Sequence, residues 1–196
     1  MINLKNLFSR ALLALMLVSG MGSALAGPMY HVTVDTSPLA GKGLLDFSFL
    51  GLDSSAAASA MLSNFVGDFA AGSMFEGDAA GDLASGVVLG NGTGLNAFTQ
   101  EVNLGGSFGF DVRFGDLGPA GDGTTLGVAL YSPGFGEYLL ASGNLATFDL
   151  MPDTPVAVSF DAAAVNVAEV PEPAALALLV FGLAIMTGMA RQRRMR

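Results

Sequence analysis

Apolar and polar residues alternate with period two through the middle of the chain, and this pattern constrains the fold more than any other feature. It is typical of a β-strand with one buried face, because successive side chains of a strand point to opposite sides of the sheet. Gly, Pro, Asn and Asp residues separate the alternating segments, as turns require. We therefore expect an all-β fold, an antiparallel β-sandwich or jelly roll. Five segments carry the pattern: residues 30–35, 45–49, 108–114, 126–130 and 156–160.

Two parts of this middle region have a weaker pattern. Residues 53–65 are rich in alanine, with Asp53 or Ser54 as candidate helix caps, yet a sandwich favours a strand here, so both helix and strand stay open. Residues 66–96 are rich in Gly and Asp, and only residues 87–89 predict a strand. We expect long surface loops in the rest of that stretch.

The glycine pair at residues 105–106 predicts a turn between two alternating segments. A three-residue loop over residues 105–107 sets Leu104 opposite Phe108 and Val102 opposite Phe110, which brings apolar residues onto one face. We therefore expect a β-hairpin with that register.

The first 26 residues have the three parts of a secretion signal. Lys5 and Arg10 are positive, residues 11–18 are apolar, and the small residues Ala24 and Ala26 precede Gly27. We expect a signal helix over residues 1–26, recognised by the secretion machinery and cut by signal peptidase before Gly27.

A second apolar stretch lies near the other end of the sequence. Residues 174–190 carry no charge, and seventeen helical residues cover about 25 Å, the short end of what spans a bilayer. We expect a transmembrane helix there. Basic residues beside a span stay in the cytoplasm, which places residues 27–168 outside. Four arginines form this basic end: Arg191, Arg193, Arg194 and Arg196.

Pro171, Glu172 and Pro173 stand immediately before this span, and two prolines hold a peptide extended and accessible. Together with the signal peptide, the order of Pro-Glu-Pro, apolar span and arginine-rich end resembles the PEP-CTERM sorting region of Gram-negative bacteria. The resemblance implies that residues 169–196 hold the exported chain in the inner membrane until an exosortase acts near Pro171, Glu172 and Pro173. It also implies release to the cell surface or the extracellular space, and a link to exopolysaccharide or biofilm production. A plain membrane anchor is the alternative.

Charge and composition exclude several functions for the domain over residues 27–168. Sixteen acidic residues but only two basic ones, Lys42 and Arg113, lie between residues 27 and 170, so the surface repels nucleic acid. The absence of cysteine excludes disulfides and thiolate chemistry. His31 is the only histidine and shares a polar strand face with Thr33 and Asp35, with no catalytic motif beside it. We expect no enzyme activity.

Two binding functions stay open for this domain. Gly-Asp pairs suggest loop calcium sites, with Asp78 and Asp82 as the best candidates, but ordinary turns use the same residues. We otherwise expect no cofactor. The main interpretation is a non-catalytic surface or matrix protein that meets extracellular polysaccharide. The alternative is a carbohydrate-binding module, with or without calcium, for which Tyr30, Tyr131 and Tyr138 are the candidate stacking surfaces.

Overall fold

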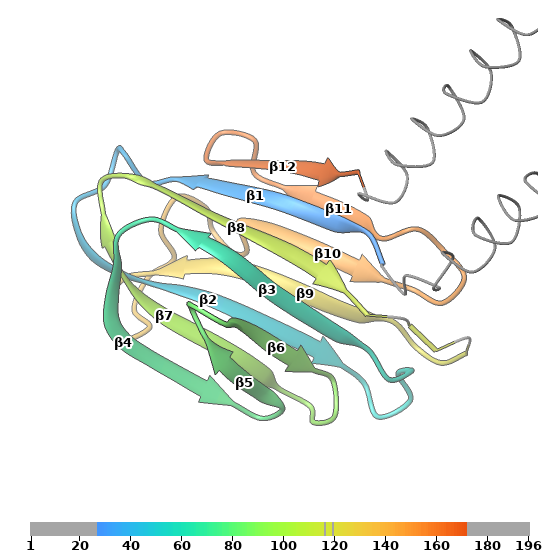
Figure 1. The fold of residues 1–196 in the computed structure, drawn as a ribbon. Helices are drawn as coiled ribbons and strands as arrows, with labels where there is room; N and C mark the ends of the chain where they lie inside the picture. Colours follow the sequence, from blue (N-terminus) through green and yellow to red (C-terminus); the bar gives the residue numbers. More distant parts are fainter. Residues whose placement is uncertain (1–26, 116, 119, 172–196) are drawn as a thin grey trace, which may run out of the picture.

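The computed structural model describes residues 27–115, 117–118 and 120–171, and these form two six-stranded sheets packed as a sandwich (Figure 1). All strand pairs in both sheets are antiparallel. The first, here called sheet A, has the order β12 (Val165–Val170), β1 (Met29–Asp35), β8 (Ser107–Phe114), β3 (Ser59–Val66), β6 (Gly86–Gly90) and β5 (Ala79–Asp82). The second, sheet B, has the order β11 (Ala157–Phe160), β10 (Ala146–Leu150), β9 (Thr124–Tyr131), β2 (Gly41–Gly51), β7 (Asn96–Leu104) and β4 (Phe69–Glu76).

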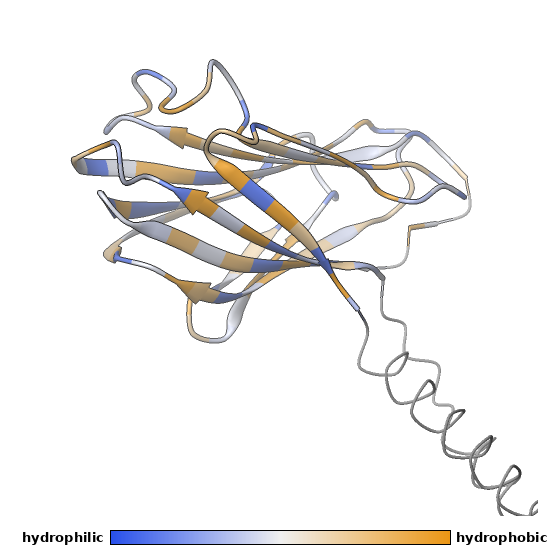
Figure 2. Cartoon of the chain, turned by 90° about the horizontal axis from the view of Figure 1, so that it is seen from above, coloured by the Kyte–Doolittle hydropathy of each residue, from blue (hydrophilic) through white to orange (hydrophobic). Residues whose placement is uncertain are grey.

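The alternating segments form strands with one face in the core, as expected. In β1, Val32 and Val34 are fully buried while His31 and Asp35 are exposed. Figure 2 shows the resulting bands of orange and blue along the strands. The segment at β11 departs from the pattern, because this strand lies at an edge of sheet B and leaves Phe160 41% exposed.

Aromatic rings from both sheets fill the space between them. Phe47 of β2 meets Phe110 of β8 edge to face, with ring centroids 4.9 Å apart. Tyr30 of β1 packs against Phe148 of β10 at 5.3 Å. Full burial of such a side chain stabilises the fold by about 1.5–3 kcal/mol. Tyr30 is therefore a core residue and is unavailable as a stacking surface for a ligand.

The predicted hairpin at residues 105–107 is wrong. Strand β7 pairs with β2 and β4 in sheet B, whereas β8 pairs with β1 and β3 in sheet A. Val102 and Phe110 are both buried, but they enter the core from opposite sheets. The two glycines connect a strand of one sheet to a strand of the other, instead of two neighbours in one sheet. The prediction failed because alternation identifies the buried face of a strand but not which strand lies beside it.

Residues 53–65, left open between helix and strand, contain most of β3. Ala60 and Leu62 are fully buried and Met61 is exposed, so the segment has the period of a strand. Pairing with β8 and β6 on either side outweighs the helix propensity of its alanines.

The expectation of loops over residues 66–96 is also wrong in part. β6 contains the predicted residues 87–89, but β4 and β5 are additional strands. Both lie at sheet edges, where side chains stay largely exposed and the apolar alternation is lost. Residues 66–96 therefore include one edge strand of each sheet, and the loops between their strands are short.

The predicted signal helix and the transmembrane helix over residues 174–190 lie outside the described residues. Within residues 27–115, 117–118 and 120–171, no helix has the length and hydropathy needed to cross a membrane.

Candidate functional site

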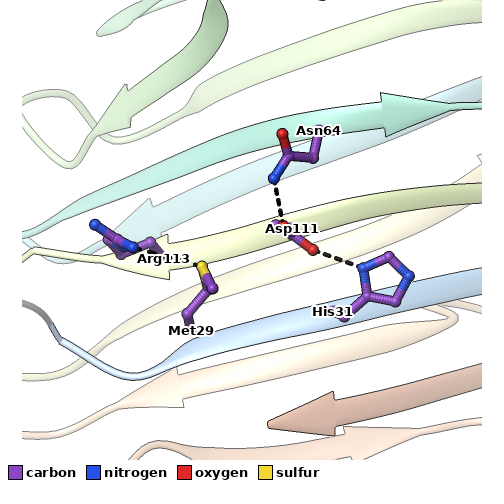
Figure 3. Close-up of polar contacts among 5 residues, drawn as sticks. All are labelled: Met29, His31, Asn64, Asp111 and Arg113. Atoms are coloured by element: carbon purple, nitrogen blue, oxygen red, sulfur yellow. Dashed lines mark hydrogen bonds and ion pairs between the residues drawn. The ribbon is translucent and has the colours of Figure 1, made fainter. Parts of the chain in front are cut away.

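His31 forms a polar cluster on the outer face of sheet A, where three neighbouring strands each contribute one side chain (Figure 3). Its Nδ1 lies 2.6 Å from Oδ1 of Asp111, and the amide of Asn64 donates to Oδ2 of the same carboxylate at 2.6 Å. The His31 side chain is 47% exposed, whereas that of Asp111 is largely buried. Asp111 is thus held from both sides.

The register of the sheet builds this cluster. His31 and Asp111 are direct partners in the pairing of β1 with β8, and Asn64 lies at an irregularity between β3 and β8, with a φ of 54°. The imidazole packs over Gly109, where a Cβ would lie in ordinary van der Waals contact with the ring, at 3.7 Å. Beside this cluster the guanidinium of Arg113 donates to the sulfur of Met29 at 3.6 Å.

This geometry ties three neighbouring strands of sheet A together through their side chains. A nucleophilic triad needs a hydroxyl or thiol hydrogen-bonded to the second imidazole nitrogen. In the part of the chain that the structure describes, the only hydrogen bond of the His31 imidazole goes to Asp111. The cluster is therefore best explained as a cross-strand tie.

The calcium candidates Asp78 and Asp82 flank β5 at its two ends. Four residues along a strand separate them by about 13 Å. Backbone amides of Ser85 and Ala84 donate to Oδ1 of Asp82, at 2.7 and 2.8 Å, and lower the pKa of this carboxyl. The structure does not bring the two aspartates together. Over the described ranges, no three His, Cys, Asp or Glu residues are grouped to hold a metal ion.

Only Gly27 and Pro171 of the predicted processing residues are described. Gly27 lies directly against the backbone of Phe114, where a Cβ would collide with the carbonyl oxygen. Pro171 is exposed and follows β12 at once. The remaining predicted residues lie outside the described ranges: Ala24, Ala26, Glu172, Pro173, Arg191, Arg193, Arg194 and Arg196.

Comparison with known proteins assigns no role to any of these sites. No family model matches this chain, and no curated protein or solved structure matches it. Their roles therefore rest on residues and geometry alone.

A groove on the outer face of sheet B is the feature that sequence reasoning missed. It has a volume of about 660 Å³, and its floor is formed by β4, β7, β2 and β9. Tyr131 ends β9, and the segment over residues 132–145 brings Phe135, Tyr138 and Asn144 to the same groove. The two tyrosines that the sequence singled out thus lie together, with hydroxyl oxygens 3.0 Å apart.

The groove also contains a buried carboxylate. Asp46 of β2 is only 9% exposed and accepts a hydrogen bond from Thr99 of β7 at 2.6 Å. Burial raises the pKa of Asp46, and the nearby Glu76 adds to this, while the Thr99 hydrogen bond opposes it. In sequence Asp46 is only the polar member of an alternating strand, so no signal marks it as buried.

Proposed function

We propose that this chain is a non-catalytic exported protein of the cell envelope. In this proposal residues 1–26 direct secretion, residues 174–190 anchor the chain in the inner membrane, and an exosortase then acts at Pro171, Glu172 and Pro173. The mature domain reaches the cell surface or the extracellular matrix, where its partner is exopolysaccharide. The resemblance of the Pro-Glu-Pro region to PEP-CTERM proteins supports this pathway.

The observation that carries the proposal is the pairing of Met29 with Val170. These residues are partners in the antiparallel pair of β1 and β12, so the described fold begins and ends at neighbouring points (Figure 1). Gly27 and Pro171, the predicted processing points, lie just beyond this pair. Removing both extensions would take away no strand of either sheet.

Two further observations support a binding role over catalysis. The His31 cluster consists of a histidine, a carboxylate and an amide, which together make a tie between strands. The excess of acidic residues over residues 27–170 disfavours self-association and nucleic acid as a partner.

We also infer that the sandwich is a jelly roll. The strand pairs β1 with β8, β2 with β7 and β3 with β6 are nested in one another, as in a long hairpin that has been rolled into two layers. The pairs alternate between sheet A and sheet B, which supports this class.

Intact-mass measurement of the chain from hosts with and without an exosortase tests the processing claim. With the enzyme we expect a species that starts at Gly27 and ends near Pro171. Without it the arginine-rich end should stay attached, and the chain should stay in the membrane fraction.

A pair of glutamate variants makes this test specific. Glu172→Ala should prevent processing. Glu169→Ala changes an exposed residue of β12 and should leave processing intact. A sorted product that retains Arg191 to Arg196 would leave a plain anchor as the explanation. Equal processing of both variants would show that the Pro-Glu-Pro residues are not recognised.

A further inference from the structure

The groove on sheet B combines a platform of aromatic rings with polar side chains on its floor. The ring centroids of Tyr131 and Tyr138 lie 4.6 Å apart, and those of Tyr131 and Phe135 lie 5.5 Å apart. Tyr138 is 43% exposed and Phe135 is 46% exposed, so both present ring surface to solvent. Rings gathered at the edge of a hollow, instead of in the core, favour contact with an apolar ligand face.

The segment that provides these rings is fixed on the sheet by backbone hydrogen bonds. Leu139 donates to the carbonyl of Leu130 at 2.8 Å, and Leu145 donates to that of Val128 at 2.7 Å. Ser132 donates to the carbonyl of Glu137 at 2.9 Å. The aromatic platform is thereby preorganised, which lowers the entropy lost when a ligand binds.

The groove floor carries hydrogen-bonding groups that suit hydroxyl-rich ligands. Thr99 occupies one oxygen of the Asp46 carboxylate, and within the described ranges no hydrogen bond occupies the other. Ser48 and Asn144 line the same hollow. Asn144 lies close over the sheet because its neighbour Gly127 has no side chain. A carboxylate, an amide and hydroxyls beside aromatic rings form the chemistry that recognises a sugar ring.

Charge narrows the class of sugar. Asp46 and Glu76 line the groove, and among the residues that the structure describes no Lys, Arg or His does. Two carboxylates repel uronic acids and other acidic sugars, but they accept hydrogen bonds from neutral hydroxyls and attract an amino group. An ammonium group could also lie over the tyrosine rings.

A second hollow suggests a polymer instead of a single sugar. It has a volume of about 800 Å³ and adjoins the first at Leu50, which lines both. Asp149 and Thr125 lie in this second part, where the Thr125 hydroxyl donates to the Asp149 carboxylate at 2.6 Å. The two hollows together extend along the face of sheet B.

We infer that the groove formed by Asp46, Thr99, Tyr131, Phe135, Tyr138 and Asn144 binds a polysaccharide made of neutral or amino sugars. The ring faces stack on the aromatic platform, and the sugar hydroxyls or amino groups donate to Asp46. Binding requires no metal ion. The inference rests on the part of the proposed function that makes exopolysaccharide the partner of the domain, and it holds or fails independently of how the two ends of the chain are processed.

Binding of the protein, in the form purified from the producing cells, to a broad glycan array tests this inference. We expect retention on neutral or amino glycans, none on uronic acid glycans, and the same result in EDTA. Retention on acidic glycans alone, or on no glycan in the array, would overturn the inference. Retention that EDTA abolishes would assign binding to a calcium site instead.

Variants locate the site on the sheet. Tyr138→Ala should weaken the Kd for the best glycan by about tenfold or more, as truncation of a central aromatic contact does. Phe160→Ala removes a ring of similar exposure from β11, away from the groove, and should leave the Kd unchanged. Equal effects of the two changes would place the site elsewhere.

Asp46→Asn separates binding from folding. The amide keeps an acceptor for Thr99 but loses the charge, so the Kd for amino glycans should weaken by about tenfold relative to neutral ones. Because this variant removes a buried charge, it should be at least as stable as the natural protein, and weaker binding then cannot come from unfolding. An unchanged preference between the two glycan classes would contradict the assigned role of Asp46.

Discussion

Asp46 is a buried carboxylate whose only hydrogen-bond donor among the described residues is the neutral hydroxyl of Thr99. A carboxylate without a cation loses hydration when it is buried, and folding therefore favours its protonated form. The raised pKa of Asp46 expresses the same cost. A side chain that opposes folding at neutral pH needs another reason to be there, and the proposed contact with a sugar provides one.

Asp46→Asn should therefore stabilise the domain at neutral pH. Because folding raises the pKa, the stability contributed by Asp46 is complete below the pKa of the unfolded chain and is lost as the pH rises through the higher folded value. Urea unfolding at pH 7 should show a larger free energy for the variant, and the difference should shrink towards pH 4. Asp149→Asn is the matched control, since Asp149 accepts the same kind of hydrogen bond from Thr125 but is only half-buried. A variant less stable than the natural protein at pH 7 would contradict this account.

The sequence identifies the chemistry of single residues better than their burial. Tyr131 and Tyr138 are recognisable as stacking surfaces because few aromatic residues here have a polar edge. The sequence does not show that these two tyrosines lie together or that Asp46 is buried beside Thr99. Both features depend on the pairing of β2 with β7 and β9, which no local pattern reveals. Tyr30 has the same chemistry but lies in the core.

Among the elements, the short connection between β7 and β8 determines how the chain passes from one sheet to the other. Gly105 has a φ of 107°, which a residue with a side chain rarely adopts. The buried Thr36 supports the connection, because its hydroxyl donates to the carbonyl of Gly106 at 2.7 Å and accepts from the amide of Gly105 at 3.1 Å.

Gly105→Ala should cost about 1–3 kcal/mol of stability, because the new side chain has to adopt an unfavourable backbone conformation. Gly106→Ala is the neighbouring control. A Cβ there meets nothing within 4 Å, so its effect should stay within about 0.5 kcal/mol. Chemical denaturation of the two variants measures the difference. Equal costs would mean that the backbone conformation at Gly105 is not the constraint.

The strands differ in how well the sequence predicts them. β1, β2, β8 and β9 follow from alternation because both of their neighbours are strands and one of their faces is in the core. β4 and β5 do not, because they bury few side chains and their sequences lack alternation, which the edge strand β11 still has. The pairing of β7 with β2 could not be inferred from residues 102–110. The two strands are far apart in the sequence, and periodicity does not encode which distant strands pair.

At the scale of the whole molecule, the dominant long-range interaction is the repulsion among the acidic residues, which far outnumber the basic ones. The sixteen acidic residues between residues 27 and 170 repel one another, and only two basic residues offset this repulsion. Added salt screens such repulsion, since the Debye length falls from about 30 Å at 0.01 M to about 8 Å at 0.15 M.

We therefore expect the unfolding temperature at pH 7 to rise when the salt concentration is raised from 0.01 to 0.15 M. For a chain of this size, 1 kcal/mol corresponds to roughly 2–4 °C, and a rise of that order is the expected result in a calorimetric scan. The rise should become smaller near pH 4, where carboxyl groups begin to protonate. A fall in unfolding temperature with salt would show that favourable ion pairs dominate instead.

The pairing of Met29 with Val170 has a consequence for engineering. Because the first and last strands are neighbours, the polypeptide follows an almost closed path. A few glycines could join its two ends, and the ring could then be opened at an exposed connection with all twelve described strands retained. The domain is thus suited to circular permutation, which would move its new ends away from the edge of sheet A.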